Sequence, residues 1–543
     1  MNYFNKYICH KSDFLIYSLV YFHRFFFQNY IFMHIERKPA KRSNWSRTEN
    51  YVAYSQIKVS SPEDISEVIK IANETGKKIY VQGREHHWGA CGESDESTIV
   101  ISPDIHFFSE IKEIDSNEAS IEIGASVRLE ELNLHLANTS WALENMGAIA
   151  EQNVSALVST NTHGAHPKKG GFSTLVQELV FVDADGIIHT CIRGHESWEL
   201  AKFVLGSTGK AGVITSLRLK LVPSFNLMVE EVMFENSDAL KQESFDQKLK
   251  IALENDAYLR WFLFPNSGTG KVLKDSEGCP LDTYETGNTQ LTVWRRTSKN
   301  GKGRGWLRGK MEGFVANYMS KKIDKFLDKD FKDRDPDWLH KVTRLMIWLM
   351  SRPYSFVGRS DLALTAEPNM PIKSQIGSHT TELYFRSECA ECVIKSVLRK
   401  IDEMASTGKC FVWKPMRLRV MSGDQDAYCS QVYDQNSSGD VYMTMDIDIY
   451  EGQFVGKVES VYSELRKEAD KAILRYNQEN KVEMPLTSFH LGKTAPLLHD
   501  EYGELFRSRP GIRIFIEYLK KQKFQTFTHP RFMDLFGLTE KPS

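Results

Sequence analysis

The stretch that decides the fold is Lys77-Lys78-Ile79-Tyr80-Val81-Gln82-Gly83-Arg84-Glu85-His86-His87-Trp88-Gly89. A short apolar strand runs directly into a turn that begins at Gly83 and contains two histidines. Backbone N–H groups that converge in such a turn bind phosphate, and a neutral imidazole beside them is a nucleophile. The stretch therefore predicts a loop, Gly83-Arg84-Glu85-His86-His87, that holds a phosphate-bearing cofactor.

The residues around this loop alternate between strand and helix patterns. Ser60-Ser61-Pro62-Glu63-Asp64 is typical of a helix start, with a serine cap, a proline in the first turn and acids at the positive helix end. Apolar residues then recur at helical spacing up to Gly76. An Asp-Gly turn within 179–190 predicts a hairpin. Further strands are expected at 57–59, 98–101, 121–124 and 213–221, and further helices at 128–137 and 197–205.

Two later segments are also rich in glycine and small residues. The first spans 147–164 and the second spans 206–214. Small side chains let a backbone approach a pyrophosphate or an adenine edge closely. Neither the Walker pattern nor the G-x-G-x-x-G dinucleotide fingerprint is present after the early strand, which disfavours a nicotinamide enzyme. The candidate cofactor residues in these segments are Gly147, Ser155, Thr160, His163, Gly164, Gly212 and Ile214.

A chain of 543 residues is too long for a single core, so at least two domains are expected. After Pro223 the pattern changes to longer strand-like runs, at 259–264 and 441–449. We predict an N-terminal extension at 1–43, a cofactor domain at 44–224, a second domain at 225–480 with a helical insertion at about 300–355, and a C-terminal segment at 481–543 that returns to the first domain.

The charge and cysteine content exclude several classes of protein. Sixty-nine basic residues against 71 acidic ones leave a net charge of −2, so no overall attraction to nucleic acid or to an anionic membrane is expected. Eight cysteines in so long a chain do not form a dense disulfide framework, which indicates a reducing, cytoplasmic compartment. The isolated Cys389-Ala390-Glu391-Cys392 lacks a second ligand pair, so two ordinary helix cysteines are favoured over zinc, and no metal is predicted.

Two segments raise the question of a membrane. The aromatic run within residues 1–32 is interrupted by polar residues, which disfavours a membrane span, and we interpret Met33 as the natural start. The basic, amphipathic segment 306–350 is a candidate for contact with a membrane surface or a partner. The favoured alternative is a helical hairpin packed on its own domain.

With His490-Leu491-Gly492-Lys493 added, these segments resemble the vanillyl-alcohol oxidase superfamily of FAD-linked oxidases, and within it the gulonolactone and arabinonolactone oxidases. The resemblance covers about 44–537 and is strongest over 57–225. It implies an α+β fold, with a two-part FAD-binding domain of the PCMH type and an α/β substrate, or cap, domain. It also implies FAD bound covalently through His86. His87 stands where these oxidases usually have serine, so His87 and a noncovalent FAD stay open as alternatives.

The same resemblance suggests roles for other residues. His163 matches a Thr-His-Gly turn that orders a loop near the flavin, and Ser155 and its neighbours include no cysteine for a second link. His490 and Lys493 match a His-Trp-Gly/Ala-Lys motif in which Leu491 replaces tryptophan. The Lys493 ammonium would stabilise the reduced flavin and hold the substrate hydroxyl.

A final pair of candidates, Arg417 and Arg419, lies on a predicted strand where the family has Glu-x-Arg. Alternation places both guanidinium groups on one face, which would favour a substrate with a carboxylate or phosphate. The alternative is that Arg417 pairs with a nearby acid, for which Glu382 is the candidate.

The sequence thus predicts oxidation of a CH–OH group in a polar, sugar-derived alcohol such as an aldonolactone, an alditol or a sugar acid. Electrons would pass to FAD and then to O₂ or another acceptor. Covalent sterol oxidases share a Gly-x-x-His-x-Trp loop like that from Gly83 to Trp88, so a sterol-type alcohol is one alternative. A flavin-fold binding protein without turnover is the other.

Overall fold

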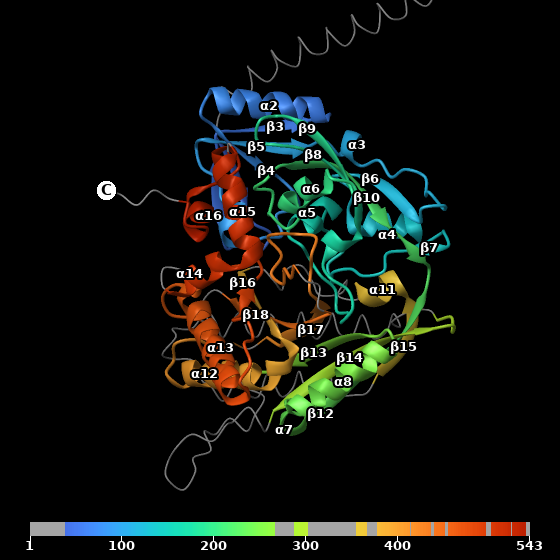
Figure 1. Ribbon diagram of the computed structural model, residues 1–543, viewed down its shortest axis with the longest axis vertical. Coiled ribbons are helices and arrows are strands. Elements are labelled where there is room, and N and C mark those ends of the chain that lie inside the picture. The colour runs from blue at the N-terminus through green and yellow to red at the C-terminus, as the bar shows by residue number, and fades with distance from the viewer. Residues whose placement is uncertain are drawn as a thin grey trace, which may run out of the picture.

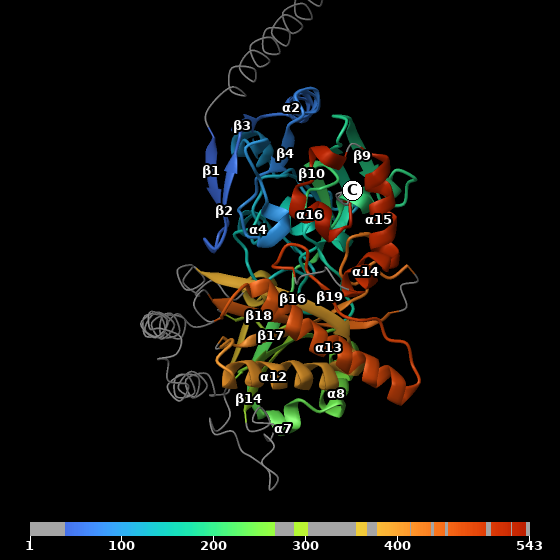
Figure 2. The same cartoon turned by 90° about the vertical axis from the view of Figure 1, so that its left-hand side faces the viewer.

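The computed structural model describes residues 39–265, 287–301, 354–365, 377–412, 414–435, 439–450, 454–495, 501–522 and 524–538. Residues 1–38 of the predicted extension at 1–43 and the amphipathic segment at 306–350 lie outside the described residues, whereas Ala40–Ser43 form a strand of the first lobe. Two lobes are stacked in Figures 1 and 2. We call residues 39–223 together with 501–538 the first lobe, and the described residues of 226–495 the second lobe.

The first lobe contains a parallel sheet that explains where the glycine loop starts. Its strand order is β3 (Ser55–Val59), β5 (Thr98–Pro103) and β4 (Lys78–Val81). Helix α2 (Pro62–Glu74) packs its apolar side on the sheet and begins as predicted, because the Ser61 side chain accepts a hydrogen bond from the Asp64 N–H. A hairpin of β1 (Ala40–Ser43) and β2 (Asn50–Ala53) lies alongside.

A four-stranded antiparallel sheet completes the first lobe. Its order is β6 (Ser120–Gly124), β10 (Val213–Lys220), β8 (Val176–Val182) and β9 (Ile188–Ile192). The predicted hairpin is confirmed, with Gly186 in the left-handed region at φ 77°. The remaining elements are α3 (Ile105–Phe108), α4 (Leu129–Leu136), β7 (Trp141–Ala142), α5 (Val154–Ser159), α6 (Trp198–Val204) and β11 (Val222–Pro223).

The second lobe is built on an eight-stranded antiparallel sheet. Its order is β15 (Tyr354–Arg359), β12 (Asn226–Glu235), β14 (Asn288–Thr297), β13 (Tyr258–Leu263), β17 (Met416–Ser422), β18 (Val441–Tyr450), β16 (Ser378–Arg386) and β19 (Ser488–Phe489). Helices α8 (Gln242–Glu254), α12 (Ala390–Ser406) and α13 (Val458–Asn480) cover the sheet face that is turned away from the first lobe (Figure 2). The opposite face is directed toward the first lobe. Short helices α7 (Asn236–Ala239) and α11 (Ser360–Leu364) flank the sheet.

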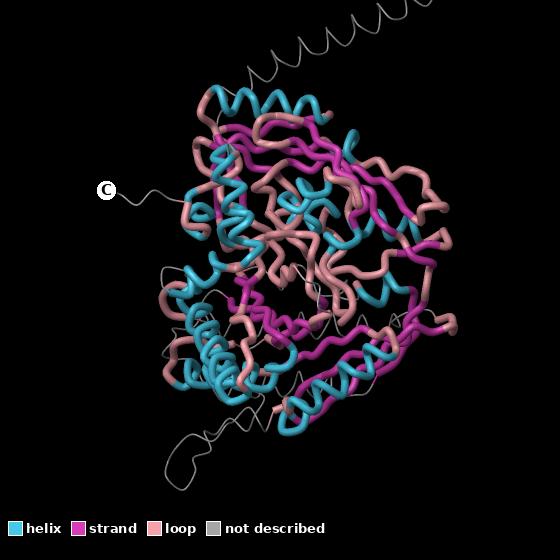
Figure 3. Tube along the Cα trace, viewed as in Figure 1, coloured by secondary structure: helices cyan, strands magenta, loops and turns pink. Residues whose placement is uncertain are grey.

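The C-terminal helices pack back on the first lobe (Figures 1 and 3). They are α14 (Glu501–Ser508), α15 (Pro510–Lys521) and α16 (Pro530–Leu535). Phe527 belongs to the same buried cluster as Ile57 and Ile79 of the parallel sheet. The α+β class predicted from the sequence is confirmed. No described helix is both long and apolar enough to cross a membrane.

Candidate active site

A cavity of about 380 Å³ opens at the carboxyl ends of β4 and β5. Open sheets with parallel strands bind ligands at this edge, because the loops that leave the strands converge there. The loop after β4, the segment 152–160 around α5 and the segment 208–214 form the walls. Nine of the twelve predicted cofactor residues line this cavity, namely Gly83, Arg84, Glu85, His86, His87, Ser155, Thr160, Gly212 and Ile214.

The other three predicted cofactor residues do not line the cavity. A Cβ atom on Gly164 would lie 1.8 Å from Asn145 Oδ1, and one on Gly147 would lie 2.7 Å from Thr162 Cγ2. Both glycines therefore allow a tight approach within the 145–164 segment. His163 is turned toward the second lobe, where it joins the polar cluster described below.

His86 is held as a neutral imidazole at the cavity wall. Its ring stacks on Trp45, with centroids 4.6 Å apart and planes 27° apart. Burial, then the positive charges of Arg84 and His87, lower the pKa of His86 to about 4. Its Nδ1 is buried and has no hydrogen-bond partner among the described residues. A neutral imidazole with a free ring nitrogen is the form that can act as a nucleophile.

His87, in contrast, is held in its charged form. Its Nε2 lies 2.7 Å from Glu85 Oε2, and Arg42 donates to that same carboxylate oxygen at 2.7 Å. Burial alone would lower the pKa of His87, but Cys91 and Glu85 raise it to about 9. A Cβ atom on Gly92 would fall 1.7 Å from His87 Cε1, so the ring is closely packed. His87 is therefore a fixed cation and not a nucleophile.

The cavity has the features that an FAD requires. Its walls have small residues, among them Gly83, Ala156 and Gly212, which let backbone N–H groups approach a diphosphate. His86 Nδ1 and Asn153 Oδ1 are buried polar atoms without partners among the described residues. Buried polar groups are normally hydrogen-bonded, so such atoms mark a place where a ligand supplies the partner. The residues present fit the group.

A second group of predicted residues meets on the sheet face that is directed toward the first lobe. Arg417 on β17 pairs in register with Asp446 on β18, and Asp446 pairs with Glu382 on β16. All three side chains therefore lie on one face of the sheet. Lys493 follows β19 and reaches across the row, with its Nζ 2.7 Å from Glu382 Oε2 and also bonded to Asp446 Oδ1.

This polar cluster, which we define as Glu382, Asp446, Asp448, Arg417, Arg419 and Lys493, combines three carboxylates with three cations. Arg419 lies 2.9 Å from Glu382 Oε1 and 3.0 Å from Asp446 Oδ2. Burial by itself would raise the pKa of Glu382, but Lys493, His163 and Arg419 hold it well below its usual range. The three negative and three positive charges cancel, so the cluster is neutral overall although it is made of charged groups.

The pairing of Arg417 changes one expectation. Its Nε lies 3.4 Å from Asp446 Oδ2, and its Nη2 lies 3.5 Å from Asp448 Oδ2. Arg417 therefore pairs with acids, as the alternative interpretation expected. The acids are Asp446 and Asp448, and the expected partner Glu382 was wrong. The argument that two arginines select an anionic substrate loses its basis, because both guanidinium charges are already balanced.

Two histidines and a tyrosine surround the cluster. His163 Nε2 lies 2.9 Å from Glu382 Oε1, and its Nδ1 lies 2.8 Å from the Gly164 carbonyl oxygen. His490 is neutral, because burial lowers its pKa to about 3, and its Nδ1 accepts a hydrogen bond from the Gly492 N–H at 3.0 Å. His490 thus shapes the turn that presents Lys493. The Tyr384 ring packs against both histidines, with centroids 5.6 Å from His163 and 6.5 Å from His490.

Sequence reasoning did not identify Asp446, Asp448 or Tyr384 as site residues. The signal was present in Met443-Thr444-Met445-Asp446-Ile447-Asp448, where polar residues alternate with apolar ones in a strand. Alternation of this kind indicates one polar face, and here the Asp446 side chain is 2% exposed and that of Asp448 is 12% exposed. Buried acids of this kind indicate charge partners or a ligand.

The cavity and the polar cluster adjoin each other where the two lobes meet. The Trp88 backbone N–H donates to the Gly492 carbonyl oxygen at 3.1 Å, and its indole N–H donates to the Ser378 carbonyl oxygen at 2.6 Å. A Cβ atom on Gly492 would lie 3.2 Å from Cγ2 of Thr160, a residue that lines the cavity. A cofactor in the cavity could therefore reach a substrate held at the cluster.

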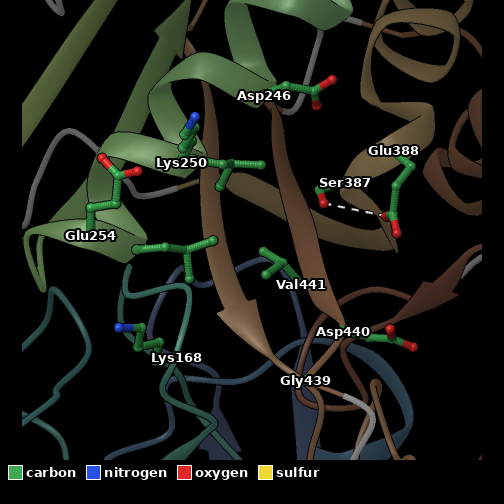
Figure 4. Close-up of a pocket in the computed structure, with 11 residues that line it drawn as sticks. Lys168, Asp246, Lys250, Glu254, Ser387, Glu388, Gly439, Asp440 and Val441 are labelled. Atoms are coloured by element: carbon green, nitrogen blue, oxygen red, sulfur yellow. Dashed lines mark hydrogen bonds between the residues drawn. The ribbon is translucent and has the colours of Figure 1, made fainter.

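A separate cavity of about 490 Å³ is lined by residues of the second lobe and by Lys168 of the first lobe (Figure 4). It is formed by α8, by Ser387 and Glu388, and by residues 439–441. None of the predicted site residues lines it.

Comparison with known proteins identifies what the fold and cavity are similar to. The family described as "FAD binding domain" matches residues 56–192. D-arabinono-1,4-lactone oxidase of Saccharomyces cerevisiae is 27% identical over 208 residues, which are 38% of this chain and 39% of that protein. L-gulonolactone oxidase of Bos taurus is 26% identical over 238 residues, which are 44% and 51% of the two chains. The chain thus matches about half or less of the length of these relatives.

Solved structures extend the comparison to the whole fold. Cholesterol oxidase from B. sterolicum matches with a TM-score of 0.64 at 14% identity, covering 92% of this chain and 97% of that one. A solvent-stable cholesterol oxidase matches with a TM-score of 0.66 at 16% identity.

The fold and the cavity thus define a flavoprotein with an FAD-binding domain of the PCMH type. Residues 56–192 match the FAD-binding domain family, and sugar-lactone oxidases are among the relatives of the chain. The resemblance to FAD-linked oxidases that the sequence predicted is confirmed.

Proposed function

We propose that this protein oxidises a CH–OH group of a polar, sugar-derived substrate with FAD as its cofactor and O₂ or another molecule as the electron acceptor. The observation that supports this most directly is the neutral polar cluster beside the cofactor cavity. Its six charged groups are arranged as hydrogen-bond donors and acceptors on one sheet face. Bound FAD would supply the electron-accepting chemistry.

In this proposal the cluster binds the hydroxyl groups of the substrate and stabilises the charge that develops during its oxidation. A carboxylate with a strongly lowered pKa, such as Glu382, is an acceptor for hydroxyl hydrogen bonds and stays ionised over the working pH range. Lys493 and Arg419 supply fixed positive charge where negative charge develops in the transition state. His86 would form the covalent bond to the cofactor, because it is the neutral histidine of the pair.

Charge balance makes a prediction about the substrate class. We expect an uncharged alditol or aldonolactone to reduce the bound flavin at least about tenfold faster than the matching sugar acid. The carboxylate of a sugar acid would have to compete with the carboxylates of the cluster for cations that are already paired. Flavin absorbance under anaerobic conditions, in the purified full chain, measures both rates. A sugar acid that reacts faster than its neutral counterpart would contradict the charge argument.

The same experiment distinguishes the alternatives. The cholesterol oxidase structures show the shared fold only. The six charged groups of the cluster disfavour binding of a sterol ring system, because its apolar rings offer no hydroxyl groups to hydrogen-bond with them. Reduction by a sterol and not by any polyol would favour the sterol-type alternative. Absence of reduction by every alcohol would favour the binding-protein alternative.

Contact of residues 306–350 with a membrane stays a prediction.

Tyr384 provides a second prediction about binding. Its hydroxyl is buried beside the cluster and makes no hydrogen bond of good geometry with the described residues. Burial, followed by the negative charge of Glu382, raises the pKa of Tyr384 well above 10, so the hydroxyl stays a donor. We expect Tyr384→Phe to raise KM for a polyol about tenfold, the effect of one lost hydrogen bond. Tyr442→Phe, one row further along the same sheet face, is the control and should leave KM unchanged.

A further inference from the structure

The Cys389–Cys392 pair has the geometry of a disulfide-forming dithiol. Cys389 ends a short 3₁₀ turn (Ser387–Cys389) and is the N-cap of α12, while Cys392 is in the first turn of that helix. Residues three apart at a helix start have Cα atoms about 5 Å apart, inside the range that a disulfide spans. The Cys392 thiol donates to the Cys389 carbonyl oxygen at 3.1 Å, which directs its sulfur back toward Cys389.

The two sulfurs differ in ways that suit a sequential reaction. Cys392 is partly exposed, whereas Cys389 is 1% exposed. The pKa of Cys392 is lowered overall. The hydrogen bond with the Cys389 thiol lowers it most, burial opposes this effect, and hydrogen bonds from the backbone N–H groups of Val393 and Cys392 lower it further. The hydrogen bond to Cys392, then burial, raises the pKa of Cys389. Sensor cysteines have this combination of an accessible thiolate beside a second thiol.

The other described cysteines provide the contrast. Cys91, Cys191, Cys410 and Cys429 are all buried. Burial raises the pKa of Cys410 to about 12 and raises that of Cys191 and of Cys429 as well, so these thiols are protonated and slow to react. The turn before Cys389 is open to small molecules, because Ser387 and Glu388 line the cavity in Figure 4.

We propose that Cys389 and Cys392 form a redox-active dithiol that hydrogen peroxide oxidises to an intrahelical disulfide. In the first step the Cys392 sulfur attacks one peroxide oxygen, the O–O bond breaks, and a sulfenic acid and one water form. In the second step the Cys389 sulfur attacks the Cys392 sulfur, the S–O bond breaks, the S–S bond forms and a second water leaves. The two thiols lose two electrons and the peroxide gains them. This inference does not depend on the proposed alcohol oxidation.

The experiment uses the full chain, reduced and freed of reductant, with hydrogen peroxide as the probe. We expect the thiols of Cys389 and Cys392 to disappear at least about tenfold faster than those of the other described cysteines, with a peptide that has lost the mass of two hydrogen atoms and joins Cys389 to Cys392. Dithiothreitol should restore both thiols. Cys392→Ser should abolish the fast loss, and Cys389→Ser should leave a sulfenic acid that dimedone traps.

Cys410→Ser is the matched control, since that thiol is buried and single. It should leave the fast loss of two thiols unchanged. Direct peptide mapping of the unsubstituted protein keeps the proposal testable if a serine variant does not fold. Sulfinic or sulfonic acid at Cys392 without the cross-link, or equal reactivity of all the described cysteines, would overturn it.

Discussion

Replacement of Lys493 by methionine is expected to slow reduction of the bound flavin by a polyol by about 100- to 1,000-fold, with little change in the amount of FAD bound. Lys493 Nζ contacts Glu382 and Asp446, which are 1% and 2% exposed, and Lys493 does not line the cofactor cavity. In the proposed function, the charge removed would act on the reacting part of the substrate. Rapid-mixing measurement of flavin absorbance gives the rate, and flavin content after gel filtration gives the binding.

The same substitution leaves two buried carboxylates without one of their cations, which costs about 3–5 kcal/mol of stability. A double variant, Lys493→Met with Glu382→Gln, restores charge balance in the cluster. We expect it to recover most of the melting temperature and none of the rate. Unchanged reduction kinetics in the single variant would refute a catalytic role for Lys493, and recovery of the rate with the melting temperature would show that its role is only structural.

The second large effect is expected at the histidine pair. His86→Ala should release all of the FAD into the supernatant when the protein is precipitated with acid, whereas the His87→Gln variant should retain flavin in the pellet. The reason is the opposite protonation of the two rings, with a pKa of about 4 for His86 and about 9 for His87. Only a neutral ring nitrogen can form the bond.

The pH dependence of flavin attachment checks the same assignment. Because the pKa of His86 is lowered, its imidazole is neutral above about pH 5, and the rate of attachment to added FAD should be constant from about pH 6 to 8 and should fall as pH approaches 4. A histidine with its ordinary pKa would lose rate already near pH 6.5. Flavin in the supernatant from the unsubstituted protein would keep the fold and remove the covalent bond from the proposal.

Much of the first lobe could be predicted because its signals are local. The cap at Ser61, the strand at 79–81 and the hairpin turn before Gly186 depend on residues that are neighbours in the chain, and each was found as expected. The loop from Gly83 to His87 follows directly from such a strand, so its place at the cavity was also predictable.

The polar cluster could be predicted only in part. Lys493 and Arg419 were identified by resemblance to a family motif, but Asp446 lies 47 residues from Lys493 in sequence. Their meeting depends on β18 pairing with both β16 and β17, which no local pattern specifies. The sequence alone therefore suggested unbalanced arginines, and the sheet register supplied the carboxylates that balance them.

The sequence by itself indicated the resemblance to FAD-linked oxidases through its motifs. It also determined the α+β class and the cofactor loop, because capping, alternation and glycine turns act over a few residues. The tertiary structure decided which histidine is neutral and which is charged. His86 and His87 are adjacent in the chain and identical in chemistry. Their pKa values differ because burial and the charges of Arg84 and His87 lower that of His86, whereas Cys91 and Glu85 raise that of His87 against its burial. Desolvation and charge pairing depend on neighbours in space, and those neighbours exist only once the chain has folded.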